Sequence, residues 1–192
     1  MKFVPTELPG VLVIEPDVHR DARGFFLETY RASRYRDGGV PDEFVQDNHS
    51  RSAGGTLRGL HAQLRRPQAK LLRCVAGEIF DVAVDVRRGS PSFGRWVGVT
   101  LSAESFRQLY IPAGFAHGFC VTSDAAEVEY KCSEVYDPGD EITVAWNDPA
   151  IGIRWPVAEP LLSARDRAAK TLAELAEALP PWNPLETSGR GG

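Results

Sequence analysis

Cysteine is scarce in this chain of 192 residues, and its three copies, Cys74, Cys120 and Cys132, cannot all pair with one another. The C-x-x-C and C-x-x-H spacings are absent, which excludes the common structural zinc sites. All three cysteines fall within apolar, strand-like runs. We therefore expect buried, reduced thiols and a cytoplasmic location.

Long apolar runs and an excess of positive charge are also missing. No run approaches the roughly 18 apolar residues of a membrane span, and the first residues lack the continuous apolar segment of a secretory signal. Lys and Arg number 22 against 26 for Asp and Glu, which gives a net charge of −4. This balance argues against nucleic acid as a partner, because nucleic-acid-binding domains are usually basic.

Glycine and proline are abundant and separate many short apolar stretches. The 18 Gly and 14 Pro residues exceed the usual combined share of about 12%. Short strands at this spacing predict an all-β sandwich or barrel rather than alternating strands and helices. The expected strands cover residues 11–15, 25–30, 43–48, 57–63, 69–75, 78–86, 96–101, 107–111, 118–122, 126–136 and 141–146.

One helix is predicted near the C-terminus, at about residues 163–179. Ser163 fits an N-cap with the acidic Asp166 three residues later. An apolar stripe follows at helical spacing, formed by Leu172, Leu175, Ala176 and Leu179. We expect one domain over residues 1–180 that includes this helix, and a flexible tail over residues 181–192.

Two strands alternate clearly enough for their faces to be assigned. In residues 126–136, Tyr130 shares the apolar face with Val128 and Cys132, so Tyr130 is expected to point inward. In residues 78–86, Val82 and its alternating apolar neighbours share one face, and the other face carries Ile79, Asp81, Ala83 and Asp85.

Polar residues interrupt several of the apolar strands. His61 and His117 are both flanked by apolar residues, and Asn48, Arg58 and Lys70 also fall in strand-like segments. A histidine in such a setting is more often a satisfied core residue than a catalyst. Charged groups in half-buried strands are costly unless paired, however, so several together predict a polar cavity inside a β-barrel.

A metal site is an alternative use for these histidines. The stretch Pro112-x-Gly-x-x-His117 resembles the second half-motif of the cupins, which are small jelly-roll barrels. The earlier strand offers only His61-Ala62-Gln63, and Lys70 nearby would repel a cation. Two histidines and a glutamine form a poor ligand set, so we expect no metal.

The polar segments form a specific ordered set along the chain. They are Arg23-Gly-Phe-Phe-Leu-Glu28, Gln46-Asp-Asn-His-Ser50, Leu57-Arg-Gly-Leu-His61, Lys70-Leu-Leu-Arg73, Asp81-Val-Ala-Val-Asp85, Ser90-Pro-Ser-Phe-Gly94, Ile111-Pro-Ala-Gly-Phe-Ala-His117, Tyr130-Lys-Cys132, Trp146-Asn-Asp-Pro149 and Leu162-Ser-Ala-Arg-Asp166. From about residue 3 to residue 172, the chain resembles the dTDP-4-dehydrorhamnose 3,5-epimerase family. No single segment is diagnostic, but the order of all of them is.

This resemblance implies a fold and a reaction. The fold is a cupin-like jelly roll, usually a homodimer with strands exchanged near the N-terminus. The reaction converts dTDP-4-dehydro-6-deoxy-D-glucose to dTDP-4-dehydro-L-rhamnose, in dTDP-L-rhamnose biosynthesis for cell-surface polysaccharide. It requires neither metal nor organic cofactor, and a membrane is not an expected partner.

The resemblance also implies catalytic roles. His61 is the base, Asp166 orients it, Tyr130 is the acid on the opposite ring face, and Lys70 stabilises an enolate oxygen. Histidine suits the base role because it titrates near neutral pH. Less specific interpretations stay open: Asp166 could only cap the helix, and Tyr130 could simply line the barrel.

Binding residues follow from the same match. Arg23, Arg58 and Arg165 are candidates for the diphosphate, and Tyr136 for stacking on thymine. Sugar or nucleotide contacts are assigned to Glu28, Gln46, Asp47, Asn48, His117 and Glu141. On a regular strand Arg58 and His61 would face opposite ways, so they share a site only if the strand bulges, as Gly59 would allow. Arg23 and Arg165 could instead be solvated surface charges.

The chain departs from the family at two positions that bear on specificity. Ala62 stands where many members carry Tyr or Phe, and Arg165 stands where Lys is common. Such changes could alter the shape of the pocket. The alternatives are an epimerase acting at C3 or C5 alone, a metal-dependent cupin oxygenase, and a non-catalytic sugar-binding cupin.

Overall fold

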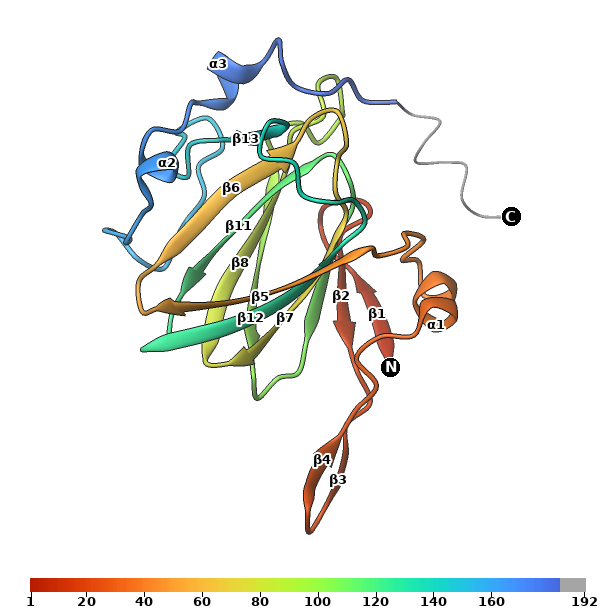
Figure 1. The fold of residues 1–192 in the computed structure, drawn as a ribbon. Helices are drawn as coiled ribbons and strands as arrows, with labels where there is room; N and C mark the ends of the chain where they lie inside the picture. The colour runs from red at the N-terminus through yellow and green to blue at the C-terminus, as the bar shows by residue number, and fades with distance from the viewer. Residues whose placement is uncertain (184–192) are drawn as a thin grey trace.

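Two antiparallel sheets packed face to face form the molecule in the computed structural model, which describes residues 1–183 (Figure 1). The first sheet has the strand order β1 (Lys2–Pro5), β2 (Leu12–Glu15), β10 (Gln108–Ile111), β7 (Lys70–Ala76), β12 (Ala125–Cys132) and β5 (Gln46–Ala53). The second has the order β13 (Glu141–Thr143), β6 (Leu57–Gln63), β11 (Phe115–Val121), β8 (Glu78–Asp85) and β9 (Trp96–Ser102). The predicted all-β, cupin-like jelly-roll class is confirmed.

The main core lies between the two sheets. Leu72 of β7 and Val128 of β12 meet Ile79 and Ala83 of β8 there. A second apolar cluster covers the outer face of the second sheet, where Val82 and its alternating partners contact Leu60, Val144, Ile151, Leu172 and Leu179. Strand β8 is therefore buried on both faces, and its alternation assigns each face correctly.

A short hairpin extends away from the two sheets. Strands β3 (His19–Asp21) and β4 (Gly24–Phe26) pair only with each other, and Figure 1 shows them reaching beyond the sandwich. Phe25 and Phe26 are 56% and 72% exposed. These two aromatic side chains lie behind the polar turn of the hairpin, and exposed aromatic side chains commonly mark contact surfaces.

Several expected boundaries shift in the structure. The strand expected at 25–30 ends at Phe26, and the strand expected at 43–48 runs instead over Gln46–Ala53. The strand expected at 126–136 ends at Cys132. Strand β1 and helix α1 (Ala32–Asp37) were not expected, because neither segment carries a clear period.

The C-terminal helical segment is divided, so the single helix expected at 163–179 is wrong. Helix α2 (Ala164–Arg167) and helix α3 (Leu172–Leu175) are separated by a short extended stretch. Lys170 in that stretch bridges to Val144, and its carbonyl accepts a hydrogen bond from Ala145 N at 2.7 Å. Thr171 and Glu174 then form a capping box that starts α3.

The start of the expected tail is tied to the sandwich. Trp182 N donates to the Arg88 carbonyl at 2.8 Å, and Arg88 N donates to Pro180 O at 2.8 Å. The rest of the tail, residues 184–192, lies outside the described residues.

Asp85 is the last residue of β8, and its buried carboxylate is the centre of a hydrogen-bond network. It accepts hydrogen bonds from Arg87, Ser90 Oγ at 2.6 Å and Ser92 Oγ at 2.7 Å. Burial alone would raise the pKa of Asp85, but these donors outweigh it and hold the pKa below the ordinary 3.8. The carboxylate therefore stabilises the fold fully above pH 3.8, and its contribution is lost as the pH falls through the lower folded-state pKa.

Asp85→Asn should accordingly destabilise the protein by about 3 kcal/mol at neutral pH, because it breaks a buried charged network. The difference from the unmodified protein should shrink below pH 3.8, as followed by urea unfolding across pH. Asp21→Asn is the matched control, since Asp21 pairs with Arg23 on the exposed hairpin and should cost little. A stability difference that does not change with pH would contradict this interpretation.

Candidate active site

A cavity of about 590 Å³ opens between the sheets on the side of α2. Its size falls within the usual range for small-ligand sites. All four residues expected to act in catalysis line it, namely His61, Lys70, Tyr130 and Asp166. So do seven of the expected binding residues, namely Gln46, Asn48, Arg58, His117, Tyr136, Glu141 and Arg165.

His61 and Asp166 form a hydrogen-bonded pair across 105 residues of sequence. His61 Nε2 donates to Asp166 Oδ1 at 2.6 Å, and Ser163 Oγ donates to Asp166 Oδ2 at 2.8 Å. Burial alone would raise the pKa of Asp166, but the hydrogen bonds from His61 and Ser163 hold it below its ordinary value. Asp166 is therefore ionised at neutral pH, and His61 Nδ1 is the nitrogen that can accept a proton.

The same contacts decide how α2 is capped. Ser163 is the N-cap, and its side chain accepts from Asp166 N at 3.0 Å. The Asp166 side chain is turned to His61 instead of completing a capping box. Asp166 therefore does more than cap the helix.

A bulge in β6 brings Arg58 and His61 to the same cavity. His61 pairs with His117, while Arg58 pairs with Phe119, so three steps along β6 match two along β11. Gly59 sits in the bulge at φ 133°, and a Cβ there would lie 2.5 Å from the Gly118 Cα. The bulge inferred from sequence at Gly59 is confirmed, and only glycine fits it.

The opposite wall of the cavity comes from the first sheet. Tyr130 of β12 and Lys70 of β7 lie there, two strands that pair with each other, and Lys70 Nζ lies 5.9 Å from the centre of the Tyr130 ring. Burial raises the pKa of the Tyr130 phenol above its ordinary 10, Cys132 adds to this, and Arg58 acts against it. Tyr130 is therefore protonated at neutral pH and can donate a proton.

His117 is held by a buried carboxylate. Its Nε2 lies 3.0 and 2.9 Å from the two oxygens of Asp81, which is fully buried on the inner face of β8. Burial raises the pKa of Asp81, and His117 and Lys70 act against that rise. The bond to Asp81 fixes the orientation of the His117 ring at the base of the cavity.

The rim of the cavity carries a network around Glu141. Glu141 Oε1 lies 3.8 Å from His61 Nδ1, and Glu141 Oε2 accepts from Tyr136 OH at 2.9 Å and pairs with Arg165. Arg165 also donates to Thr143 Oγ1 at 3.0 Å. Arg165 is thus part of the site rather than a solvated surface charge.

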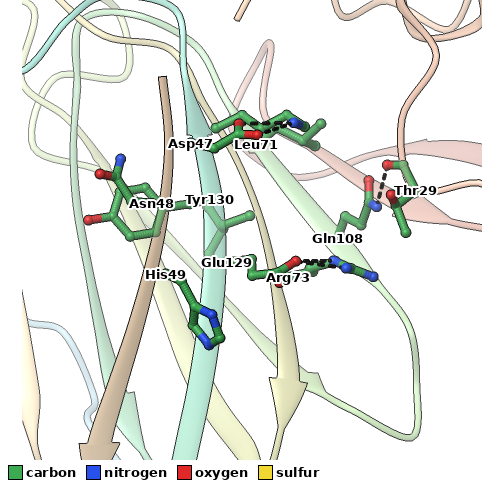
Figure 2. Close-up of a pocket in the computed structure, with 11 residues that line it drawn as sticks. Thr29, Asp47, Asn48, His49, Leu71, Arg73, Gln108, Glu129 and Tyr130 are labelled. Atoms are coloured by element: carbon green, nitrogen blue, oxygen red, sulfur yellow. Dashed lines mark hydrogen bonds and ion pairs between the residues drawn. The ribbon is translucent and has the colours of Figure 1, made fainter. Parts of the chain in front are cut away.

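Three expected binding residues do not line this cavity. Arg23 lies on the β3–β4 hairpin with its side chain 90% exposed, and Glu28 pairs with Arg31 and Arg34. Asp47 faces a second cavity of about 390 Å³ on the outer side of the first sheet (Figure 2). Two ion pairs lie in this second cavity: Lys131 pairs with Asp47, and Arg73 pairs with Glu129 (Figure 2).

Ala62 does not shape the cavity. It is buried in the apolar cluster on the outer face of the second sheet, next to Leu60 and Val144. The expectation that this position alters the pocket is therefore not supported by its place in the fold, because alternation along β6 turns it away from His61.

Some lining residues were not expected from the sequence. They include Ser50, Gln68, Cys132 and Ser163. Period-two alternation could have found two of them, since Ser50 follows Asn48 by two residues and Gln68 precedes Lys70 by two. The Ser50 hydroxyl is buried without a hydrogen-bond partner.

The described part of the chain contains neither a metal-binding cluster nor a membrane-spanning helix. Within residues 1–183, no three His, Cys, Asp or Glu side chains are grouped as they would be around a metal ion. In the same part of the chain, no helix has the length and apolar character needed to cross a membrane.

Comparison with known proteins gives consistent matches. A dTDP-4-dehydrorhamnose 3,5-epimerase from Neisseria gonorrhoeae is 55% identical over 175 residues, which are 91% of this chain; the chain spans only 53% of that relative's length. The structure of a dTDP-6-deoxy-D-glucose-3,5-epimerase from Legionella pneumophila, in complex with dTDP-4-keto-L-rhamnose, is 49% identical with a TM-score of 0.92. That match covers 95% of this chain and 98% of the Legionella chain.

A third match has a different specificity. The structure of a 3′-monoepimerase from Streptomyces bikiniensis, in complex with dTDP-quinovose, is 40% identical with a TM-score of 0.87 and covers 94% of this chain and 93% of that one. The family model described as dTDP-4-dehydrorhamnose 3,5-epimerase matches residues 5–174. Together with the fold and the cavity, these matches show that the chain belongs to the dTDP-4-dehydrorhamnose 3,5-epimerase family.

Proposed function

We propose that this protein inverts C3 and C5 of dTDP-4-dehydro-6-deoxy-D-glucose to give dTDP-4-dehydro-L-rhamnose. The observation that supports the proposal is that the His61–Asp166 pair and Tyr130 lie on opposite walls of one cavity. His61, paired with Asp166, lies on the second sheet, and Tyr130 lies on the first. Inversion of a carbon centre needs a proton to leave one face and return to the other.

Proton removal is assigned to His61. The C4 ketone acidifies the hydrogens on C3 and C5, and His61 Nδ1 takes one of them as a proton. The electron pair left on carbon moves into the ring and places negative charge on O4. Asp166 stabilises the imidazolium that forms and keeps Nε2–H out of the reaction.

Lys70 and Tyr130 complete the step. The Lys70 ammonium stabilises the negative O4, an effect worth roughly 3–4 kcal/mol for one well-placed donor. Tyr130 then transfers its phenolic proton to the carbon from the opposite face, and the C4 ketone is restored. Before the second centre reacts, His61 releases its proton to solvent and Tyr130 takes a proton from solvent.

Substrate binding is assigned to the remaining lining residues. Arg58 and Arg165 hold the diphosphate through their guanidinium groups. Arg165 also pairs with Glu141 at the rim of the cavity, so this assignment has its guanidinium shared between Glu141 and the diphosphate. Tyr136, 45% exposed at the rim, offers a ring for the thymine, and Gln46, Asn48 and His117 contact the sugar or nucleotide.

We further assign Arg23 and Glu28 to the cavity of a second copy in a homodimer. Neither residue lines the cavity of its own chain, and both flank the exposed Phe25 and Phe26 of the projecting hairpin. Burying the Phe25 and Phe26 rings against a partner would remove apolar surface from water. Asp47 faces the outer cavity of Figure 2, where it pairs with Lys131, so it is not assigned to the sugar.

The cellular location proposed is the cytoplasm. All three cysteines are buried and free, and Cys132 lines the cavity, as expected for a protein kept in a reducing compartment.

A second candidate is inversion at one centre alone. This alternative is supported by the 40% identity to a 3′-monoepimerase, because that relative has the same fold and is named for epimerisation at a single position. Proton NMR of the dTDP-ketosugar in D₂O separates the two, because each inverted centre gains deuterium. Exchange at both C3 and C5 with formation of the L-configured product supports the double epimerase, exchange at one supports the alternative, and exchange at neither contradicts both.

Turnover should not depend on a metal ion. The Lys70 ammonium lies on the wall that faces His61 and His117, and its positive charge would repel a divalent cation held between them. Dialysis against a strong chelator should leave the rate of product formation unchanged. Loss of activity that one added divalent ion restores would favour the cupin oxygenase class of site instead.

A further inference from the structure

The ammonium group of Lys70 is hydrogen-bonded to the side chain of a buried glutamine, Gln68. Lys70 Nζ donates to Gln68 Oε1 at 2.8 Å, and Cys132 Sγ lies 3.9 Å from the same nitrogen. The third neighbour of the ammonium is the Tyr130 ring, whose centre lies 5.9 Å from Lys70 Nζ. The position of the charge is set by these contacts rather than by the flexible lysine stem.

The orientation of the Gln68 amide is itself determined. Gln68 Nε2 donates to the Glu134 carbonyl at 2.7 Å, which leaves Oε1 as the atom that faces Lys70. Gln68 is 8% exposed and lines the cavity. It is held in one arrangement at both ends of its amide.

Both atoms that anchor Lys70 are uncharged. Over residues 1–183, no carboxylate lies within ion-pair distance of Lys70 Nζ. Asp81, whose pKa Lys70 affects, is already engaged by His117. A neutral acceptor orients an ammonium without forming an ion pair with it, so the charge of Lys70 can act on an anion that forms in the cavity.

We propose that Gln68 is a positioning residue for the epimerase reaction, which holds the Lys70 ammonium against the developing enolate oxygen while leaving its charge uncompensated. This inference rests on the proposed function, since it concerns the same reaction. It assigns Gln68 no direct contact with the reacting carbon atoms.

The test uses two variants and one matched control. Gln68→Met keeps the length of the side chain but removes the acceptor, and it should lower kcat about tenfold with little change in KM. Gln68→Glu keeps an acceptor but adds a negative charge beside Lys70, and it should lower kcat further, by about 100-fold. Gln63→Met is the control, because Gln63 is also buried and bonds Arg66 O, Val135 O and Asp137 N but does not contact Lys70.

The control separates positioning from stability. We expect Gln63→Met and Gln68→Met to lower the melting temperature by similar amounts, while only Gln68→Met slows deuterium exchange into the substrate. If Gln68→Met fails to fold, Gln68→Glu and its kcat decide. Normal kcat in both Gln68 variants, with normal exchange by the unmodified chain, would overturn this inference alone. Absence of exchange by the unmodified chain would instead overturn the proposed function and this inference with it.

Discussion

Replacing His61 with alanine should abolish proton exchange at C3 and C5 together. One base serves both centres in the proposed mechanism, and His61 is the cavity histidine that Asp166 orients with a 2.6 Å hydrogen bond. General base catalysis contributes roughly 10²–10⁴-fold, so the exchange rate should fall by at least that factor at both carbons when the base is missing. NMR of the substrate in D₂O measures this directly. Continued exchange at either carbon would mean that a second base acts there, with His117 the first candidate.

Asp166→Asn tests the dyad without removing the base. The amide keeps the size of the side chain but loses the charge that stabilises the imidazolium, so exchange should slow at least tenfold. If Asp166 acted mainly through the helix, the change would cost on the order of 1 kcal/mol of stability and leave turnover nearly intact. Thr171→Ala is the matched control, since Thr171 caps α3 and does not line the cavity.

Tyr130→Phe should separate proton removal from inversion. His61 is intact in this variant, so the enolate still forms, but the donor on the opposite wall is gone. The proton then returns mostly from the face it left, and deuterium should enter the substrate with little or no inverted product. The loss of epimerised product should be roughly 10²–10⁴-fold.

The fold should survive this change, because the ring remains. Tyr35→Phe provides the control: the Tyr35 hydroxyl bonds Gln108 Oε1 and Thr29 O at 2.7 Å in a fully buried position away from the cavity. It should cost stability but leave inversion unchanged. Full inversion by Tyr130→Phe at the unmodified rate would identify water or another residue as the donor.

The strand predictions succeeded where alternating residues of a strand face different surroundings. Residues 57–63 were predicted with the correct bounds, and the alternation in residues 126–136 placed Tyr130 on the inward face. The prediction failed at residues 163–179, where the apolar spacing suits one helix. The helix is interrupted because Lys170 pairs with Val144, the residue that follows β13. A local sequence pattern carries no information about such a distant partner.

The sequence by itself determined the residue types of the site and their order, because period-two alternation decides which side chains share a face and the ordered motifs decide the family. It also indicated Gly59 as the position where β6 could bulge, and the structure shows the bulge there. The family resemblance paired Asp166 with His61, and the structure shows the hydrogen bond between them. Only the tertiary structure decided that Arg165 joins Glu141 and that Arg23 lies outside the cavity. Such contacts join residues far apart in the chain, and they form only when the two sheets and α2 pack together.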